Sequence, residues 1–313
     1  MRTSDHIERR VKLNDLHVLM RVVEAGSMNK AAALLNTTQS AVSRSIAELE
    51  RTIGVRLLDR SPQGVEPTNY GRTLLSGGAA VFDDLRQSLK SIEFLADPTA
   101  GEVRIGCNPF LAASFVSAVV DRLSRRHPRI VFHLVTAYVE TLHRELRARN
   151  VDLLITRRSG PIADDGLDYE SLFDDSYFVA AGTKSPWARR RTIDLAELVN
   201  ELWVLPPPQS VIGTVATEAF RKGGLEYPRT TVFALPAEVR ISLLATGRFL
   251  SIFPASVLKF PVTRADLKIL PVKQAFSRVS VGIVTLKNRA LSPVAQLFIG
   301  GAREIGRPRA QRK

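Results

Sequence analysis

The sequence has little sulfur and no long apolar stretch. Its 313 residues include one cysteine, Cys107, and three methionines. A single cysteine excludes a disulfide framework and any zinc site built from several cysteines, and it is typical of a reducing compartment. No apolar run reaches the roughly 18 residues that cross a bilayer, and the first ten residues are mostly polar or charged. We therefore expect a cytoplasmic protein with neither a membrane span nor a secretory signal.

The sequence also lacks the motifs that mark phosphate-binding loops, dinucleotide folds, zinc proteases and serine hydrolases. Its five histidines form no pair four residues apart, so we expect no metal and no cofactor. Cys107 would need a positioned base to act as a catalytic nucleophile, and we expect no enzymatic activity. An inert thiol is the favoured interpretation of Cys107, and a redox-responsive thiol is the alternative.

Basic residues outnumber acidic ones, but unevenly along the chain. The 44 lysines and arginines against 31 aspartates and glutamates give a net charge of +13. Residues 1–70 carry 10 basic and 8 acidic side chains, whereas residues 101–313 carry 31 and 19, with a basic tail at 307–313. A positive excess favours a polyanionic partner such as nucleic acid. If the N-terminal segment binds nucleic acid, a few placed side chains must do so.

The first seventy residues predict three short helices. The first has one apolar stripe, formed by Leu16, Leu19, Met20 and Val23. Ser27 can cap the second helix, and Thr38 can cap the third, which ends at Gly54. A helix, a tight turn and a helix over about 28–47 form the helix-turn-helix arrangement. The third helix starts with a polar face suited to the major groove, formed by Gln39, Ser40, Ser43 and Arg44.

Two short strands are expected after the third helix. Residues 57–60 and 65–68 have strand character, and residues 61–64 are rich in turn formers. Such a hairpin is a wing, and it places Arg60 where it can reach the DNA backbone or minor groove. An ordinary solvated helix surface is the alternative interpretation of the polar face, and the wing argues against it. The expected domain spans residues 11–68.

A set of residues between positions 16 and 71 is typical of one protein family. They are Leu16, Ala25-Gly26-Ser27, Ala31-Ala32, Leu34-Leu35, Thr38-Gln39-Ser40-Ala41-Val42-Ser43, Ile46, Leu49-Glu50, Ile53-Gly54, Leu57-Leu58-Asp59-Arg60 and Thr68-Asn69-Tyr70-Gly71. With these residues the segment resembles the LysR-type transcriptional regulators. Two positions depart from the family pattern, because Ser40 stands where proline is usual and Leu58 where phenylalanine is usual.

The resemblance implies a sequence-specific transcription factor that binds double-stranded DNA. It places the polar face of the third helix in the major groove, and it assigns contacts with the backbone or through the wing to Lys30, Thr37, Thr38 and Arg60. Two-fold symmetric subunits would bind an interrupted palindrome. The family further implies a dimer of dimers, a small-molecule effector, and RNA polymerase as a further partner. The hydroxyl of Ser40 can change the base preference.

Small and apolar residues then repeat at alternating intervals of four and three. They are Gly71, Leu75, Gly78, Phe82, Leu85, Leu89, Ile92 and Ala96. This heptad pattern predicts a helix over 69–96 with a coiled-coil seam. The resemblance favours a linker helix that pairs antiparallel with a second subunit, and a helix that packs on its own domain is the alternative. The pair Gly77-Gly78 marks either a close approach or a soft point.

Strand and helix patterns alternate over residues 102–306. Strands are expected near 103–105, 130–135, 152–155, 177–181, 202–205, 231–235, 249–253, 267–272 and 279–286, with helices at 111–126 and 139–149. This alternation predicts parallel sheets covered by helices. The fold class is therefore α/β, with an N-terminal all-α winged helix-turn-helix and a long linker helix. The resemblance implies a two-lobed effector domain similar to periplasmic binding proteins. A solute-binding protein without DNA function is the alternative.

Three loops at the carboxyl ends of strands are expected to form the effector site between the lobes. They supply Cys107, Asn108, Phe110, Thr156, Arg157, Pro208, Gln209 and Ser210. Asn108, Thr156, Gln209 and Ser210 would supply hydrogen bonds, and either Arg157 or Arg158 would supply a counter-charge for an anionic ligand. The C-terminal pattern somewhat resembles the galactose-binding-protein regulator subgroup, which suggests a sugar or an organic acid as the effector.

Overall fold

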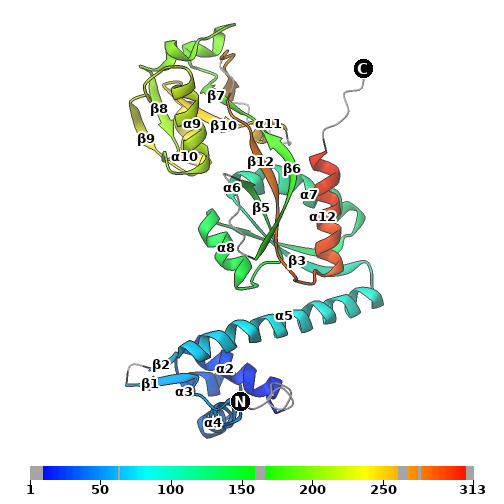
Figure 1. The fold of residues 1–313 in the computed structure, drawn as a ribbon. Coiled ribbons are helices and arrows are strands. Elements are labelled where there is room, and N and C mark those ends of the chain that lie inside the picture. Colours follow the sequence, from blue (N-terminus) through cyan, green and yellow to red (C-terminus); the bar gives the residue numbers. More distant parts are fainter. Residues whose placement is uncertain (1–9, 63, 159–165, 260–266, 274–275, 308–313) are drawn as a thin grey trace. The chain divides into compact units, whose positions relative to one another are not determined.

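The computed structural model describes residues 10–62, 64–158, 166–259, 267–273 and 276–307. The chain divides into two compact units, Met1–Gln87 and Ser88–Lys313, which are described separately. Figure 1 shows their elements along the chain. In the described part of the chain, no helix is both long enough and apolar enough to cross a membrane.

Three helices build the core of the first unit: α2 (Leu13–Ala25), α3 (Met28–Leu34) and α4 (Gln39–Ile53). Thr38 caps α4, because its hydroxyl accepts a hydrogen bond from the amide of Ala41 at 3.2 Å. The turn before α4 is sharp, with Asn36 in the left-handed region at φ 50°. One apolar face of each helix is buried in a shared core that includes Leu19, Val22, Ala31, Ile46 and Leu49.

A two-stranded wing follows α4. Strands β1 (Leu58–Ser61) and β2 (Gly64–Pro67) pair antiparallel, with Arg60 opposite Val65. The carboxylate of Glu50 accepts hydrogen bonds from the amides of Leu57 and Leu58 at 2.7 and 3.2 Å. Glu50 therefore fixes the start of the wing to α4, which determines where Arg60 stands relative to that helix.

The two halves of the long helix α5 (Asn69–Ala96) differ in how far their apolar side chains are buried. In its first half, Leu74, Leu75 and Phe82 pack against the core of the first unit. In its second half, Leu85, Leu89 and Ile92 are exposed. The first half of α5 therefore packs on its own domain, and the second half presents exposed apolar side chains at heptad spacing. Pairing with a second subunit stays a prediction.

The glycines of α5 are not equivalent. A Cβ atom on Gly71 would lie 2.1 Å from the carbonyl oxygen of Leu57, and one on Gly78 would lie 2.9 Å from Leu16 Cδ1. A Cβ atom on Gly77 would meet nothing within 4 Å. Gly78 is therefore a close-approach point, whereas Gly77 is an ordinary solvent-facing helix position.

The second unit contains two lobes, each with a mixed sheet. The first sheet has the strand order β4-β3-β5-β12-β6, and the second has the order β11-β7-β10-β8-β9. The first-lobe strands are β3 (Ala100–Cys107), β4 (Arg129–Thr136), β5 (Leu153–Arg158), β6 (Leu167–Asp175) and β12 (Val279–Leu286). The second-lobe strands are β7 (Tyr177–Gly182), β8 (Leu202–Leu205), β9 (Thr230–Phe233), β10 (Phe249–Pro254) and β11 (Leu267–Ile269).

Helices cover both faces of each sheet. In the first lobe, α7 (Ser117–Arg126) and α12 (Pro293–Gly306) pack on one face, and α8 (Val139–Arg147) packs on the other. In the second lobe, α9 (Val211–Lys222) and α10 (Ala237–Ala245) pack on opposite faces. Two short helices, α6 (Pro109–Leu111) and α11 (Ser256–Lys259), follow β3 and β10.

The expected parallel sheets are confirmed only in part, since β3 pairs parallel with β4 and β5, and β8 pairs parallel with β9 and β10. Strand β12 pairs antiparallel with both β5 and β6, and β7 pairs antiparallel with both β10 and β11. The chain crosses from β6 into β7 and later returns to the first lobe through β12, so β12 enters its sheet in the opposite direction. The sequence pattern also missed β6 itself, because its burial does not alternate regularly.

Gly71 and Gly77 offer a matched test of the packing of α5. We expect Gly71→Ala to lower the free energy of unfolding of the first unit by about 2–3 kcal/mol, because the new methyl group overlaps the Leu57 carbonyl. Gly77→Ala should raise it by about 0.5–1 kcal/mol through helix propensity. Urea unfolding followed by circular dichroism measures both. Equal effects of the two substitutions would contradict the close approach.

Candidate functional site

The start of α4 presents a polar surface. Gln39, Ser40 and Arg44 are exposed there, and Ser43 is half-buried. On the opposite face of the same helix, Val42, Ile46 and Leu49 are buried in the core. The helix is thus held through its apolar face, and its first turns remain accessible to a large partner.

The other residues expected at DNA surround this surface. Lys30 on α3, Thr37 before α4 and Arg60 on β1 are all exposed. The Thr38 hydroxyl is already engaged, because it caps α4 and lies 3.0 Å from the Ser40 hydroxyl. Thr38 therefore shapes the start of the helix as well as being part of the surface.

A cleft of about 730 Å³ lies between the two lobes of the second unit. The first lobe contributes Asn108, Phe110, Thr156 and Arg157, and the second contributes Gln209 and Ser210. Six of the eight residues expected at the effector site therefore line one cleft. The structure brings the three loops together because each follows the carboxyl end of a parallel strand: β3, β5 or β8.

Two of these residues also cap helices. Asn108 accepts a hydrogen bond from the amide of Leu111 at 2.9 Å, and Ser210 accepts one from the amide of Gly213 at 3.1 Å. The Ser210 hydroxyl also donates to the carbonyl of Pro207 at 2.7 Å. Their side chains therefore orient the backbone at the edge of the cleft before they meet any ligand.

Cys107 and Pro208 do not line the cleft. Side chains alternate along β3, and Cys107 shares with Val103 and Ile105 the face that is buried in the first-lobe core, at 0% exposure. Burial raises the pKa of the Cys107 thiol to about 12, so the thiol is protonated at neutral pH. Both observations favour the inert interpretation. Pro208 is exposed outside the cleft, and the neighbouring Pro207 lines it instead.

Arg157 is not a free counter-charge. Its guanidinium lies 2.9 Å from the carboxylate of Asp175, and the two side chains are only 3% and 2% exposed. Asp175 also accepts hydrogen bonds from the amide and the hydroxyl of Ser256, at 2.9 and 2.7 Å. Arg157 thus belongs to a buried ion pair beside the cleft, and its expected role as a counter-charge for a ligand stays a prediction.

Sequence reasoning missed one wall of the cleft. Tyr138, His143 and Arg147 line it from α8 and the turn before it, and Arg158 lies 5.1 Å from the ring centroid of Tyr169. His143 and Arg147 are four residues apart on a strongly amphipathic helix. That spacing predicts that the two side chains share one face of α8, but it does not predict that this face borders the other lobe.

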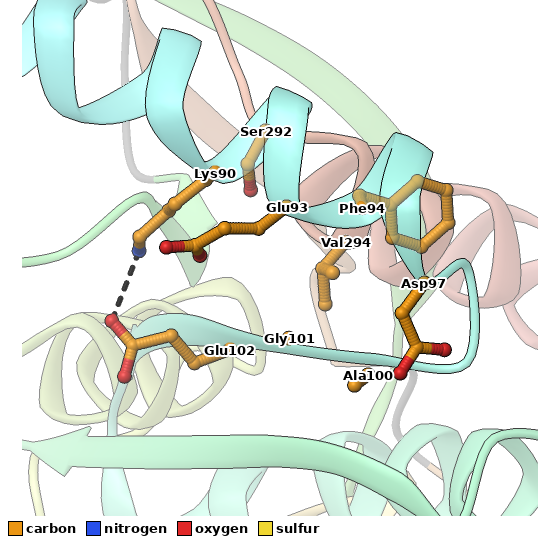
Figure 2. Close-up of a pocket in the computed structure, with 9 residues that line it drawn as sticks. All are labelled: Lys90, Glu93, Phe94, Asp97, Ala100, Gly101, Glu102, Ser292 and Val294. Carbon is orange, nitrogen blue, oxygen red and sulfur yellow. Dashed lines mark ion pairs between the residues drawn. The ribbon is translucent and has the colours of Figure 1, made fainter.

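A second cavity, of about 220 Å³, lies where the end of α5 meets the first lobe (Figure 2). Lys90 forms an ion pair with Glu102 at 3.1 Å, as Figure 2 shows. Phe94 packs against the first-lobe core, and Asp97 pairs with Arg129 at 2.6 Å. These contacts attach the last turns of α5 to the first lobe.

Comparison with known families identifies both units. Residues 13–72 match the family described as "Bacterial regulatory helix-turn-helix protein, lysR family", and residues 96–306 match the "LysR substrate binding domain". The chain belongs to the LysR family. As a LysR-family protein it is a DNA-binding transcription regulator with an effector-binding domain, and the expected fold class is confirmed.

Individual relatives of this LysR-family regulator are distant but match over nearly their full length. The regulator GbpR of Azospirillum brasilense is 25% identical over 298 residues, which cover 95% of this chain and 87% of GbpR. Full-length OxyR from Pseudomonas aeruginosa has a TM-score of 0.69 at 18% identity, covering 97% of this chain and 99% of that one. CbnR complexed with its target DNA has a TM-score of 0.56 at 20% identity, covering 95% and 100%. These structures share the fold.

Arg157 and its neighbour Arg158 provide a matched test of the buried ion pair. We expect Arg157→Ala to lower the free energy of unfolding by about 3–5 kcal/mol, because it leaves the Asp175 carboxylate buried and unpaired. Arg158→Ala, at an exposed position against Tyr169, should cost about 1 kcal/mol or less. Denaturant unfolding of the full chain measures both. Similar losses in the two variants would contradict the structural role of Arg157.

Proposed function

We propose that this LysR-family regulator reads its operator through the first two turns of α4 and is controlled by an organic acid or sugar in the cleft. The observation that carries the proposal is the exposed polar start of α4 on a helix whose other face is buried. Gln39, Ser40 and Arg44 offer amide, hydroxyl and guanidinium groups, which are the groups that bind base edges in the major groove. Lys30, Thr37 and Arg60 then contact phosphates around them.

The operator is an interrupted palindrome bound by a symmetric assembly. The exposed seam of Leu85, Leu89 and Ile92 on α5 supports pairing with a second copy of the chain, since an apolar stripe of this length is costly in water. A dimer then presents two copies of α4 to two half-sites. Dimers associate further into a dimer of dimers, and RNA polymerase is the partner through which bound regulator changes transcription.

The protein carries out this role in the cytoplasm and without enzymatic activity. The named relatives, such as GbpR, are transcriptional regulators. Within the described residues, no group of histidine, cysteine or acidic side chains is arranged to hold a metal ion. The buried Cys107 thiol, with its raised pKa, also lacks the properties of a nucleophile. The regulatory alternative through Cys107 oxidation is disfavoured for the same reason.

Substitution of Arg44 tests the DNA-binding surface. We expect Arg44→Ala to weaken operator affinity by roughly 10- to 100-fold, because one guanidinium contact in a groove contributes about 1–3 kcal/mol. Arg51→Ala is the matched control, since Arg51 is exposed in the last turn of the same helix and pairs with Glu48. Its operator affinity should equal that of the wild type. Operator fragments recovered by genomic precipitation supply the DNA, and wild-type affinity of Arg44→Ala would refute the assignment.

The cleft residues with the greatest freedom to bind a ligand are Thr156 and Gln209. Thr156 is 4% exposed and lines the cleft, and its hydroxyl makes one long contact, of 3.5 Å, with the carbonyl of Arg157. Gln209 is exposed near the end of the loop between β8 and α9, directly before the cap residue Ser210. Asn108 and Ser210 then add backbone amides at the helix starts that they cap, where partial positive charge favours an anion or a sugar hydroxyl.

Variants of these two residues test the effector site. Once a metabolite screen identifies a ligand by thermal shift, Thr156→Val and Gln209→Ala should each raise its half-saturating concentration about 10-fold, through the loss of a hydrogen bond worth about 1–1.5 kcal/mol. Operator binding without effector should be unchanged. Gln296→Ala on α12 is the control outside the cleft. Unchanged ligand affinity in both cleft variants would place the effector elsewhere.

A further inference from the structure

A fully buried arginine lies at the junction of the two lobes. Arg240 on α10 is 0% exposed, and its guanidinium carbon lies 4.6 Å from the ring centroid of Phe253 and 4.9 Å from that of Phe110. Phe253 belongs to β10 of the second lobe, whereas Phe110 belongs to the first lobe and lines the cleft. The guanidinium is therefore covered by an aromatic side chain that itself faces the ligand space.

Only part of this guanidinium is hydrogen-bonded. Its Nη1 atom donates to the carbonyl of Ile252 at 2.9 Å and lies 3.4 Å from the Ser251 hydroxyl. Its Nε and Nη2 atoms are buried and have no hydrogen-bond partner among the residues that the structure describes. The N–H groups of Nε and Nη2 point the same way, so together they form the edge of an arginine that binds a carboxylate with two bonds.

The same protein shows what this edge binds. In the pair between Arg303 and Glu170, Nε and Nη2 each donate to one carboxylate oxygen at 2.7 Å. That pair lies on the surface of the first lobe, where both side chains are about half exposed. Arg240 presents the equivalent edge in a buried position, where a charge-assisted bond is stronger because water does not compete for it.

No carboxylate of the residues that the structure describes forms an ion pair with Arg240. Burial, and next the neighbouring Arg157, lower the pKa of Arg240 to about 9, so it remains protonated at neutral pH. The carboxylate of Asp175 is already bound by Arg157 and Ser256. The Glu238 carboxylate opposes the lowering only weakly and is exposed. A buried cation in these surroundings is stabilised when an anion approaches it.

We propose that Arg240 is a concealed binding site for a carboxylate group of the effector, with Phe110 as its cover. Ala237 and Glu238, which lie in the turn of α10 just before Arg240, line the cleft together with Phe110. A rotation of Phe110 away from the guanidinium would open the Nε–Nη2 edge to the cleft. The inference rests on the proposed function of the cleft, and it commits the effector to a carboxylic acid rather than a neutral sugar.

The concealed site also links ligand binding to the arrangement of the lobes. Phe110 bridges them, because it comes from the first lobe and contacts Phe253 in the second at a centroid distance of 6.0 Å. A carboxylate that takes the place of Phe110 beside Arg240 removes that contact. We infer that such a ligand binds more tightly to lobe arrangements that lack this contact, and a difference in affinity is the condition for it to shift their populations.

Acetate, the smallest stable alkyl carboxylate, is the probe. Thermal unfolding of the full chain is followed while sodium acetate replaces sodium chloride at constant ionic strength and neutral pH. We expect the wild type and Arg125→Met, a variant of an exposed arginine on α7 outside the cleft, to gain a few degrees in Tm, and Arg240→Met to gain none. Phe110→Ala removes the cover and should reach its half-maximal shift at roughly tenfold lower acetate, because the open state no longer has to be populated first. Acetamide, the neutral analogue, should shift none of them.

Several results would overturn the inference. These are an equal acetate shift in the wild type and Arg240→Met, a shift with acetamide as large as that with acetate, or a higher acetate requirement in Phe110→Ala. Should Arg240→Met not fold, Arg240→Lys keeps the charge without the two-bond edge and should show a clearly weaker acetate shift; an undiminished shift counts against the site. Operator affinity is measured on the same variants. If the acetate results contradict the site while operator binding is intact, only this inference fails, because acetate binding is measured without DNA and Arg240 lies far in sequence from α4.

Discussion

The buried ion pair between Arg157 and Asp175 determines how the ligand-binding unit is assembled. Asp175 is the last residue of β6, where the chain leaves the first lobe, and Arg157 lies near the end of β5. Ser256, the first residue of α11 after β10 of the second lobe, bonds to the same carboxylate. One carboxylate thus connects two strands of the first lobe to the end of a strand of the second. Removing two charges from water is costly, so they persist only because each compensates the other.

The cleft depends on this connection. Thr156 and Asn108 stand beside the pair, and the loops that end β3, β5 and β8 converge only if the lobes keep their orientation. Burial, and next the nearby guanidinium of Arg157, lower the pKa of a second guanidinium, that of Arg240. Among the described residues, this junction therefore has the buried guanidinium groups of Arg157 and Arg240 beside the carboxylate of Asp175, and we infer that this imbalance favours the binding of an anionic ligand.

The DNA-binding unit depends on local interactions rather than on one buried ion pair. Its elements are short and are ordered by local signals, such as the cap at Thr38, the left-handed turn at Asn36 and the bonds from Glu50 to the wing. The net charge of the whole chain, +13, says little about it, because the first seventy residues contribute a small share. We therefore expect specificity to come from a few side chains on one helix, where the position of each group rather than the total charge decides which groups meet the bases.

Sequence reasoning was accurate where the determinants are local. The helices of the first unit, the wing, and the heptads of α5 follow from caps, turns and periodicity within a few residues. The three cleft loops were found because they follow strands, and six of the eight expected residues line the cleft. The antiparallel pairing of β7 and β12 and the buried ion pair of Arg157 were not predicted, because both depend on how a chain that crosses twice between lobes returns to pair with itself.

The sequence by itself determined the winged helix-turn-helix, the long helix and the family, since those patterns depend on residues that are close together in the sequence. Only the tertiary structure decided that Cys107 faces the core, that Arg157 pairs with Asp175, and that Arg240 lies under Phe110. The partners in the last two cases lie 18 and 130 residues apart along the chain. No periodicity encodes such a separation, and the energetics of a charge depend on its burial and its neighbours, which exist only once the chain has folded.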